Sequence, residues 1–186
     1  MPLAMNRIAI HLWLNSYHAE WLDCIMKVLT EFGGNIPLVI CGCVFLYKMR
    51  YGIFLTIPQV IAMMMVQPLK HIFNHPRPLV VFQEAGVALP TVAGVDLHSW
   101  NSFPSGHTAS VFALMVAIAM LLPKKWMKIC CIVFAAIVGY SRIYLSQHFL
   151  DDVIAGAVIG IIAAIANPLK MKKETTESAK CTETNN

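Results

Sequence analysis

Three positively charged residues lie where uncharged, apolar stretches end, and their placement predicts an anion site. Lys70 and Arg77 bracket the sequence KHIFNHPRP, and Arg142 lies within YSRIYLSQHFLDD. An ionisable group at the edge of an apolar segment is costly unless it has a partner or a task. Phosphate is the favoured anion, because a guanidinium binds it through two parallel hydrogen bonds and an ammonium adds a point charge. Each cation taken alone also fits a residue that reaches the membrane interface and sets the depth of its helix.

The sequence FPSGH, from Phe103 to His107, stands directly before an apolar stretch and predicts a phosphate-binding helix start. Ser105 and Gly106 would offer backbone N–H groups in the first turn, where unpaired donors and the helix dipole favour an anion. Glycine lets the backbone approach a ligand closely. His107 would stand at the mouth of this site, with a side chain suited to general acid catalysis. A plain turn followed by a helix cap explains the same residues except His107.

His148 is followed by acidic residues three and four positions later. In a helix, positions i and i+4 share a face, so Asp152 would hold one imidazole nitrogen and leave the other free as a nucleophile or base. Asp151 fits by geometry as well. A pair that only caps a helix start is an equally good interpretation. The spacing therefore indicates an oriented histidine, but it does not choose between the two aspartates, or between His107 and His148 as the nucleophile.

The composition indicates which solvent surrounds the elements that position these residues. Charged residues make up 13% of the 186 positions and apolar residues 58%, whereas soluble domains carry roughly 25% charged residues. A domain of this size still exposes a large surface, so the expected solvent is lipid. The high apolar content excludes a disordered chain. The net charge of +4 is modest, so nucleic acid is not an expected partner.

Uncharged stretches predict five membrane-spanning helices, since a span needs about 20 mostly apolar residues. The expected spans lie near residues 32–50, 51–69, 107–123, 126–142 and 150–169. Residues 1–31 carry apolar residues at helical spacing between charges, which predicts an amphipathic helix in the membrane interface. We therefore expect an all-α fold, an integral membrane bundle of five to six helices. It would form a single domain over residues 1–170, followed by a polar cytoplasmic tail at residues 171–186.

The basic residues near the ends of the spans predict the orientation of this bundle. If the turn that carries Lys48 and Arg50 is cytoplasmic, nine basic residues lie on that side and five on the other, as the positive-inside rule favours. The three motifs then face the outside. The expected location is the cytoplasmic (inner) membrane, crossed several times, with the active site on the extracytoplasmic face.

Taken together, the three motifs resemble the signature of the type 2 phosphatidic acid phosphatase superfamily. This superfamily includes membrane lipid phosphatases, bacterial acid phosphatases and vanadium haloperoxidases. The signature extends over residues 70 to 152 and is complete at the following positions: Lys70, Arg77, Pro78, Pro104, Ser105, Gly106, His107, Ser141, Arg142, His148 and Asp152. The helical layout extends the resemblance to nearly the whole chain.

The resemblance implies a role for each of these side chains. His148 would be the nucleophile that forms a phosphohistidine, Asp152 rather than Asp151 would orient it, and His107 would protonate the leaving oxygen. Water would then release phosphate from the phosphohistidine. The expected phosphate-binding residues are Lys70, Arg77, Ser105, Gly106 and Arg142. No metal or other cofactor is expected, because the three cations would already neutralise the charge of the phosphate, and phosphoryl transfer depends chiefly on positioning and on donors aimed at the developing charge.

The function expected from this resemblance is hydrolysis of a phosphate monoester or diphosphate on a lipid head group. Undecaprenyl diphosphate and a lipid A phosphate are the leading candidates, and phosphatidylglycerol phosphate and phosphatidic acid are the others. The expected partners are the phosphorylated lipid and the bilayer, and the oligomeric state is not indicated. The alternative is a protein that binds or transports an anionic lipid without chemistry, which needs the three cations but not His107, His148 and Asp152. Haloperoxidase chemistry would need bound vanadate and does not fit a membrane setting.

Other reactive residue types in the chain predict no second site. The six cysteines show no CxxC spacing and are interpreted as small packing residues. His71 and His75 have the spacing of a zinc pair, but the cations beside them oppose a metal ion. The loop from Leu79 to Phe103, with Glu84 and Asp96, is expected to select the head group, because the shared motifs contact only phosphate.

Overall fold

The computed structural model of the chain describes residues 2–169 and, within this range, contains helices and no strand. The helices are α1 (Pro2–Leu14), α2 (Glu20–Glu31), α3 (Ile36–Tyr47), α4 (Met49–Phe73), α5 (Pro78–Ala85), α6 (Gly106–Leu121), α7 (Lys125–Tyr144) and α8 (Leu150–Ile165). The all-α prediction is confirmed. The expected polar tail at residues 171–186 lies outside the described residues.

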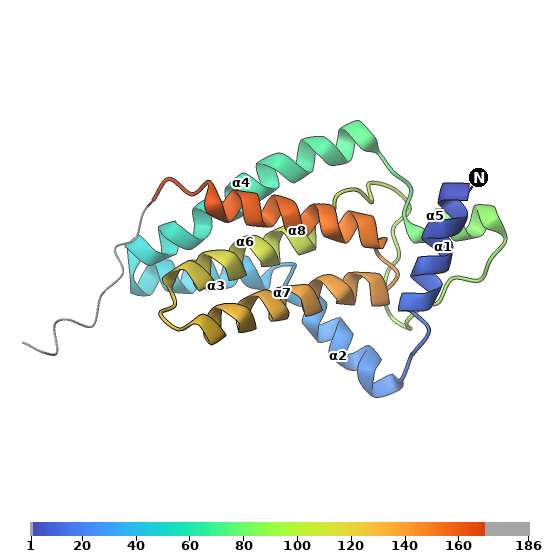
Figure 1. The fold of residues 1–186 in the computed structure, drawn as a ribbon, viewed down its shortest axis with the longest axis horizontal. Helices are drawn as coiled ribbons and strands as arrows, with labels where there is room; N and C mark the ends of the chain where they lie inside the picture. Colours follow the sequence, from blue (N-terminus) through green and yellow to red (C-terminus); the bar gives the residue numbers. More distant parts are fainter. Residues whose placement is uncertain (1, 170–186) are drawn as a thin grey trace, which may run out of the picture.

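Five helices form an elongated bundle, and they coincide with the five stretches expected to span the membrane. These are α3, α4, α6, α7 and α8, which run along the long axis of the molecule (Figure 1). Helix α6 is central, since it packs against α4, α7 and α8. Helices α1 and α5 lie at one end of the bundle, where α4 and α7 end and α6 and α8 begin (Figure 1). That end therefore gathers all three sequence motifs.

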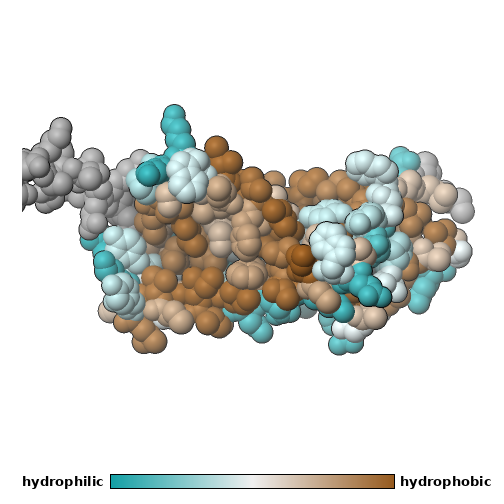
Figure 2. All heavy atoms as spheres, turned by 90° about the horizontal axis from the view of Figure 1, so that it is seen from below, coloured by the Kyte–Doolittle hydropathy of each residue, from teal (hydrophilic) through white to brown (hydrophobic). Residues whose placement is uncertain are grey.

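The surface of the bundle is apolar. Figure 2 shows hydrophobic atoms across the middle of one face, with polar atoms toward the two ends. Two segments of the described chain are long and apolar enough to cross a membrane, Met49–Ala85 and Lys125–Tyr144, and a third qualifies if α2 and α3, bent by 49°, form one span. Helices α6 and α8 have 16 residues each, a length of about 24 Å. The membrane character is thus established, while the count of five spans stays a prediction.

Residues 1–31 were expected to form one amphipathic helix, and this expectation is wrong, because they form the two helices α1 and α2. Polar contacts at the end of α1 explain the break. Asn15 Nδ2 donates to the carbonyl oxygen of Ile143 at 2.9 Å, and His11 Nε2 lies 3.2 Å from Ser146 Oγ. Both His11 and Asn15 are buried. Because these contacts hold α1 over the α7–α8 loop, the chain must turn before α2 can pack along α7.

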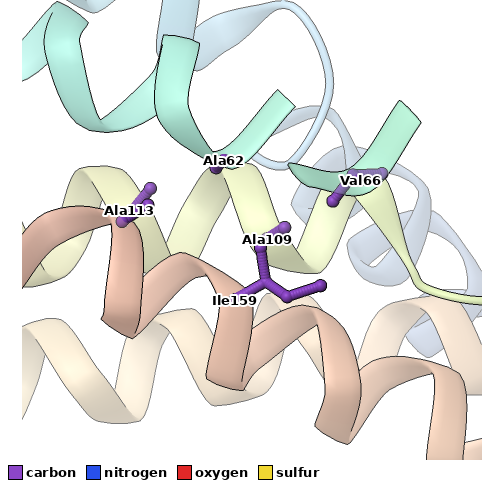
Figure 3. Packing of buried hydrophobic residues seen from close by; sticks show 6 residues of the cluster. Ala62, Val66, Ala109, Ala113 and Ile159 are labelled. Carbon is purple, nitrogen blue, oxygen red and sulfur yellow. The ribbon is translucent and has the colours of Figure 1, made fainter. Parts of the chain in front are cut away.

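Small residues bring α6 and α8 close together. A Cβ atom added to Gly156 would lie 2.4 Å from the carbonyl oxygen of Ser105, and one on Gly160 would lie 2.4 Å from that of Ala109. This four-residue spacing of glycines is typical of closely packed helices in membranes. The same contact extends to α4 through a cluster shown in Figure 3, which includes Ala62, Val66, Ala109, Ala113 and Ile159. The first turns of α6 and α8 are thereby held side by side.

Candidate active site

His148 lies in the short loop between α7 and α8 and is almost fully buried. Its backbone N–H donates to the carbonyl oxygen of Arg142 at 3.2 Å. Its Nδ1 lies 3.6 Å from Oδ2 of Asp152, in the first turn of α8. The same carboxylate oxygen accepts the backbone N–H of Phe149 at 3.0 Å. Asp152 therefore caps α8 and also faces His148. The spacing suggested either a helix cap or a carboxylate beside the histidine, and the side chain of Asp152 occupies both positions.

The structure separates the two adjacent aspartates. Asp152 is completely buried, whereas the side chain of Asp151 is 54% exposed and points to Arg7, with 2.8 Å between Asp151 Oδ2 and Arg7 Nη2. Within the described chain, only Asp152 of these two lies within ion-pair distance of His148. Asp152, the aspartate that the resemblance implies, is thus the one whose carboxylate lies beside His148.

Ser102 is a site residue that sequence reasoning missed. Its hydroxyl donates to Oδ2 of Asp152 and lies 3.5 Å from Nδ1 of His148. Its backbone N–H donates to the carbonyl oxygen of His75 at 3.0 Å. No side-chain pattern marks this serine, which stands 46 positions from His148. Its position just before FPSGH is the one available signal.

The start of α6 brings the FPSGH motif to the histidine and its aspartate. Ser105 caps the helix, since its Oγ accepts the backbone N–H of Thr108, and its own backbone N–H donates to the carbonyl oxygen of Asp152 at 3.0 Å. A Cβ atom added to Gly106 would lie 3.8 Å from Nζ of Lys70. The last turn of α4 thus places an ammonium beside the first amides of α6, as an anion site requires.

Two buried arginines complete the positive cluster. Arg77 Nε donates to the carbonyl oxygen of Trp100 at 3.0 Å, and its Nη1 donates to Oε1 of Gln147, the neighbour of His148, at 3.0 Å. Arg142 Nη1 donates to Oγ1 of Thr30, and its Nε has no hydrogen-bond partner in the part of the chain that the structure describes. Within residues 2–169, neither arginine nor Lys70 forms an ion pair. Uncompensated buried cations are costly, so the cluster favours a bound anion.

The electrostatic surroundings keep His148 neutral. Burial lowers the pKa of His148 well below its ordinary value near 6.5, and the charges of Arg142, Arg77 and Lys70 lower this pKa further. A neutral imidazole that carries its proton on Nδ1, toward Asp152, has a lone pair on Nε2. That atom is then available as a nucleophile.

His107 lies between two cavities of different character. One, of about 340 Å³, is lined by polar groups that include Lys27, Glu31, Asp96, His98 and Arg142. The other, of about 370 Å³, is lined by Lys70 and Gly106 together with apolar residues that include Leu38, Met63 and Val66. His107 lines both cavities. The loop from Leu79 to Phe103 was expected to select the head group. Of its two acidic residues, Asp96 lines the first cavity and Glu84 does not.

The cavity lined by Lys70 and Leu38 continues along the bundle. A further groove of about 610 Å³, between α3 and α4, shares Leu38, Gln59, Met63 and Gln67 with it. The lining of this groove is almost entirely apolar. An apolar path therefore leads from the side of Lys70 and His107 to the flank of the bundle.

Comparison with known proteins gives consistent matches. A family model described as the PAP2 superfamily matches residues 47–175. The undecaprenyl-diphosphatase of Sulfolobus acidocaldarius is 31% identical over 150 residues, which are 79% of this chain and 69% of that protein. The lipid A 4'-phosphatase of Bacteroides thetaiotaomicron is 40% identical over 58 residues, 31% of this chain and 26% of that protein. The crystal structure of LpxE from Aquifex aeolicus superposes with a TM-score of 0.71 at 28% identity, over 85% of this chain and 92% of that one.

Proposed function

This chain belongs to the PAP2 superfamily, and from that premise we propose that it hydrolyses a lipid phosphate through a phosphohistidine on His148. The observation that carries this proposal is the buried pair of His148 and Asp152, 3.6 Å apart, beside cations that form no ion pair with any residue of the described chain. A protein that only binds an anionic lipid needs the cations but has no use for a buried histidine oriented by a carboxylate.

In the first step, Lys70, Arg77, Arg142 and the amide of Gly106 hold the equatorial phosphoryl oxygens. The lone pair on Nε2 of His148 attacks phosphorus, and the bond from phosphorus to the leaving oxygen breaks. His107 donates a proton to that oxygen. The positive charge that develops on the imidazole faces Asp152, whose carboxylate stabilises it.

In the second step, water attacks the phosphohistidine and gives a proton to His107. The bond between phosphorus and Nε2 breaks, its electron pair returns to the imidazole, and phosphate leaves. The polar cavity beside His107 gives water access to the site, and neither step uses a metal ion.

We propose undecaprenyl diphosphate as the leading substrate. The relative named for this activity is similar over 79% of the chain, whereas relatives named as lipid A phosphatases are similar over 31% to 62% of it. The apolar path between α3 and α4 begins beside Lys70 and His107, so it fits a leaving group that carries a hydrocarbon chain. The sequence distribution of basic residues, nine expected on the cytoplasmic side and five on the other, supports a site on the extracytoplasmic face.

The test is release of phosphate from purified protein presented with undecaprenyl diphosphate, lipid A, phosphatidylglycerol phosphate and phosphatidic acid. We expect release from undecaprenyl diphosphate and loss of activity in His148→Ala. His71→Ala serves as the matched control, because His71 is exposed on α4. An acid-labile phosphorylated protein should appear in single turnovers. If His148→Ala keeps its activity, or if no lipid releases phosphate, the proposal is wrong and lipid binding without chemistry is favoured.

The orientation is tested separately by the accessibility of tags in whole cells. A tag in the 86–98 loop should react with a membrane-impermeant reagent, and a tag in the Leu122–Lys124 turn should not. Labelling in the opposite pattern would place the site in the cytoplasm.

A further inference from the structure

Helix α1 brings a charged side chain to the buried aspartate of the site. Arg7 Nη2 lies 3.6 Å from Oδ1 of Asp152 and 2.8 Å from Oδ2 of Asp151. Arg7 belongs to a region that the family model does not match, since that match begins at residue 47. None of the three motifs includes it.

The two carboxylate oxygens of Asp152 have different neighbours. Oδ2 accepts the Ser102 hydroxyl and the Phe149 N–H and faces His148. Oδ1 is buried and accepts no hydrogen bond from residues 2–169. Within the same range, Arg7 is the cation that lies within ion-pair distance of it. A buried carboxylate with one oxygen unsatisfied is costly. The guanidinium of Arg7 offsets that cost on the side away from His148.

Arg7 is held in place by more than its ion pairs. Its guanidinium carbon lies 4.2 Å from the centre of the Phe149 ring, and four residues later His11 packs edge-on against the rings of Phe82 and Phe149. Asn15 fastens the end of α1 to the backbone of Ile143. A helix anchored at these points can fix the position of a charge, as a residue that acts through another must do.

We propose that Arg7 is a positioning residue that holds Asp152 as an ionised carboxylate, so that its other oxygen orients His148 for attack. The proposal rests on the proposed function of His148 and Asp152. Formation of the phosphohistidine places positive charge on the imidazole, and an ionised carboxylate stabilises that charge better than a neutral acid does. Arg7 does not touch the substrate, so its loss should slow the phosphorylation step and leave substrate binding unchanged.

The experiment compares Arg7→Met, Arg7→Lys and Asp151→Asn in the 186-residue chain with undecaprenyl diphosphate as the substrate. Methionine removes the charge and keeps an apolar stem over Phe149. We expect Arg7→Met to lower kcat about tenfold with an unchanged KM, and Arg7→Lys to recover most of that loss. Asp151→Asn removes the exposed partner of Arg7 and should keep nearly full activity, because it leaves the contact with Asp152.

A double-variant cycle shows whether Arg7 acts through Asp152. On the background of Asp152→Asn, the change Arg7→Met should have no further effect on kcat. The proposal is overturned if Arg7→Met lowers kcat equally in the unmodified protein and in Asp152→Asn. It is also overturned if Asp151→Asn lowers kcat as much as Arg7→Met does, or if Arg7→Met keeps full activity. If Arg7→Met does not fold, Arg7→Lys is compared with Arg7→Gln. The proposal is then overturned if Arg7→Lys is no more active than Arg7→Gln. Inactivity of the unmodified protein would contradict the proposed function, whereas normal activity in Arg7→Met contradicts only the role of Arg7.

Discussion

The backbone N–H of Ser105 donates to the carbonyl oxygen of Asp152 at 3.0 Å. This hydrogen bond joins the residue that caps α6 to the first turn of α8. It therefore also joins the expected anion site at the start of α6 to the aspartate that faces His148. The glycines of α8 allow this contact, because a Cβ atom on Gly156 would lie 2.4 Å from the backbone of Ser105. The position of His148 relative to the start of α6 is therefore set by helix packing.

Replacement of Gly156 by alanine should disturb both stability and activity. Overpacking at a tight contact typically costs about 1–3 kcal/mol, and here the displaced atom is backbone at the start of α6. We expect a lower Tm in detergent and a lower kcat. Gly42→Ala is the matched control, because a Cβ atom on Gly42 meets no atom of the described residues within 4 Å. An unchanged Tm and kcat in Gly156→Ala would contradict the close packing of α6 on α8.

Gly34 should limit the position of His107. A Cβ atom on Gly34 would lie 3.3 Å from Nε2 of His107, so Gly34→Ala crowds the imidazole that we propose as the general acid. Small displacements of a catalytic group are costly in rate, and we expect kcat to fall about tenfold with little change in Tm. Gly42→Ala again serves as the control. Equal kcat in the two variants would show that His107 tolerates a neighbouring methyl group.

Removal of the Ser102 hydroxyl should slow the reaction without removing a charge. The hydroxyl donates to the carboxylate of Asp152, and a hydrogen bond to a charged group contributes about 1.5–3 kcal/mol. We therefore expect Ser102→Ala to lower kcat by about 10- to 100-fold. Ser16→Ala, at an exposed serine, should match the unmodified protein. The measurement is the rate of phosphate release, and a rate within twofold of normal would exclude a role for Ser102.

The lowered pKa of His148 predicts a specific pH dependence. Because burial keeps this imidazole neutral well below pH 6.5, its protonation should not reduce kcat/KM between pH 7.5 and 6.5. The unfolded chain binds a proton at His148 near pH 6.5, whereas the folded chain does so only at lower pH. Stability from this group is therefore fully present above pH 6.5 and is lost as pH falls toward the folded pKa. Tm should drop less on acidification in His148→Asn, and an equal drop in both proteins would contradict the prediction.

The proposed chemistry predicts how the enzyme responds to chelators and to vanadate. Since neither step uses a metal, dialysis against EDTA should leave kcat unchanged. Vanadate, which resembles phosphate during its transfer, should compete with the lipid for the cationic site and inhibit. Arg142→Ala should weaken this inhibition. Loss of activity in EDTA that Mg²⁺ restores would show that a metal takes part.

Much of the arrangement could be predicted because the physical constraints are local. Long apolar runs determine that the chain is helical and meets lipid, and bound phosphate calls for cations and backbone donors at a helix start. The residues that escaped prediction act through distant contacts. Ser102 lies 46 positions from His148, and Arg7 lies 144 positions from Asp151. The break between α1 and α2 has the same origin, because the buried partners of His11 and Asn15 come from the end of α7 and the loop after it.

The sequence by itself determined the residue types, their spacing and the apolar helices that carry them, since these follow from the chemistry of phosphate and from the length of uncharged runs. The spacing left Asp151 and Asp152 equivalent and the family resemblance implied Asp152, but only the tertiary structure shows the physical difference between them. Packing of α8 against α6 buries Asp152 beside Ser102 and His148, while Asp151, one position earlier and 100° around the helix, stays exposed and pairs with Arg7. Two adjacent carboxylates of equal chemistry differ only in what surrounds them, and surroundings are decided by the fold.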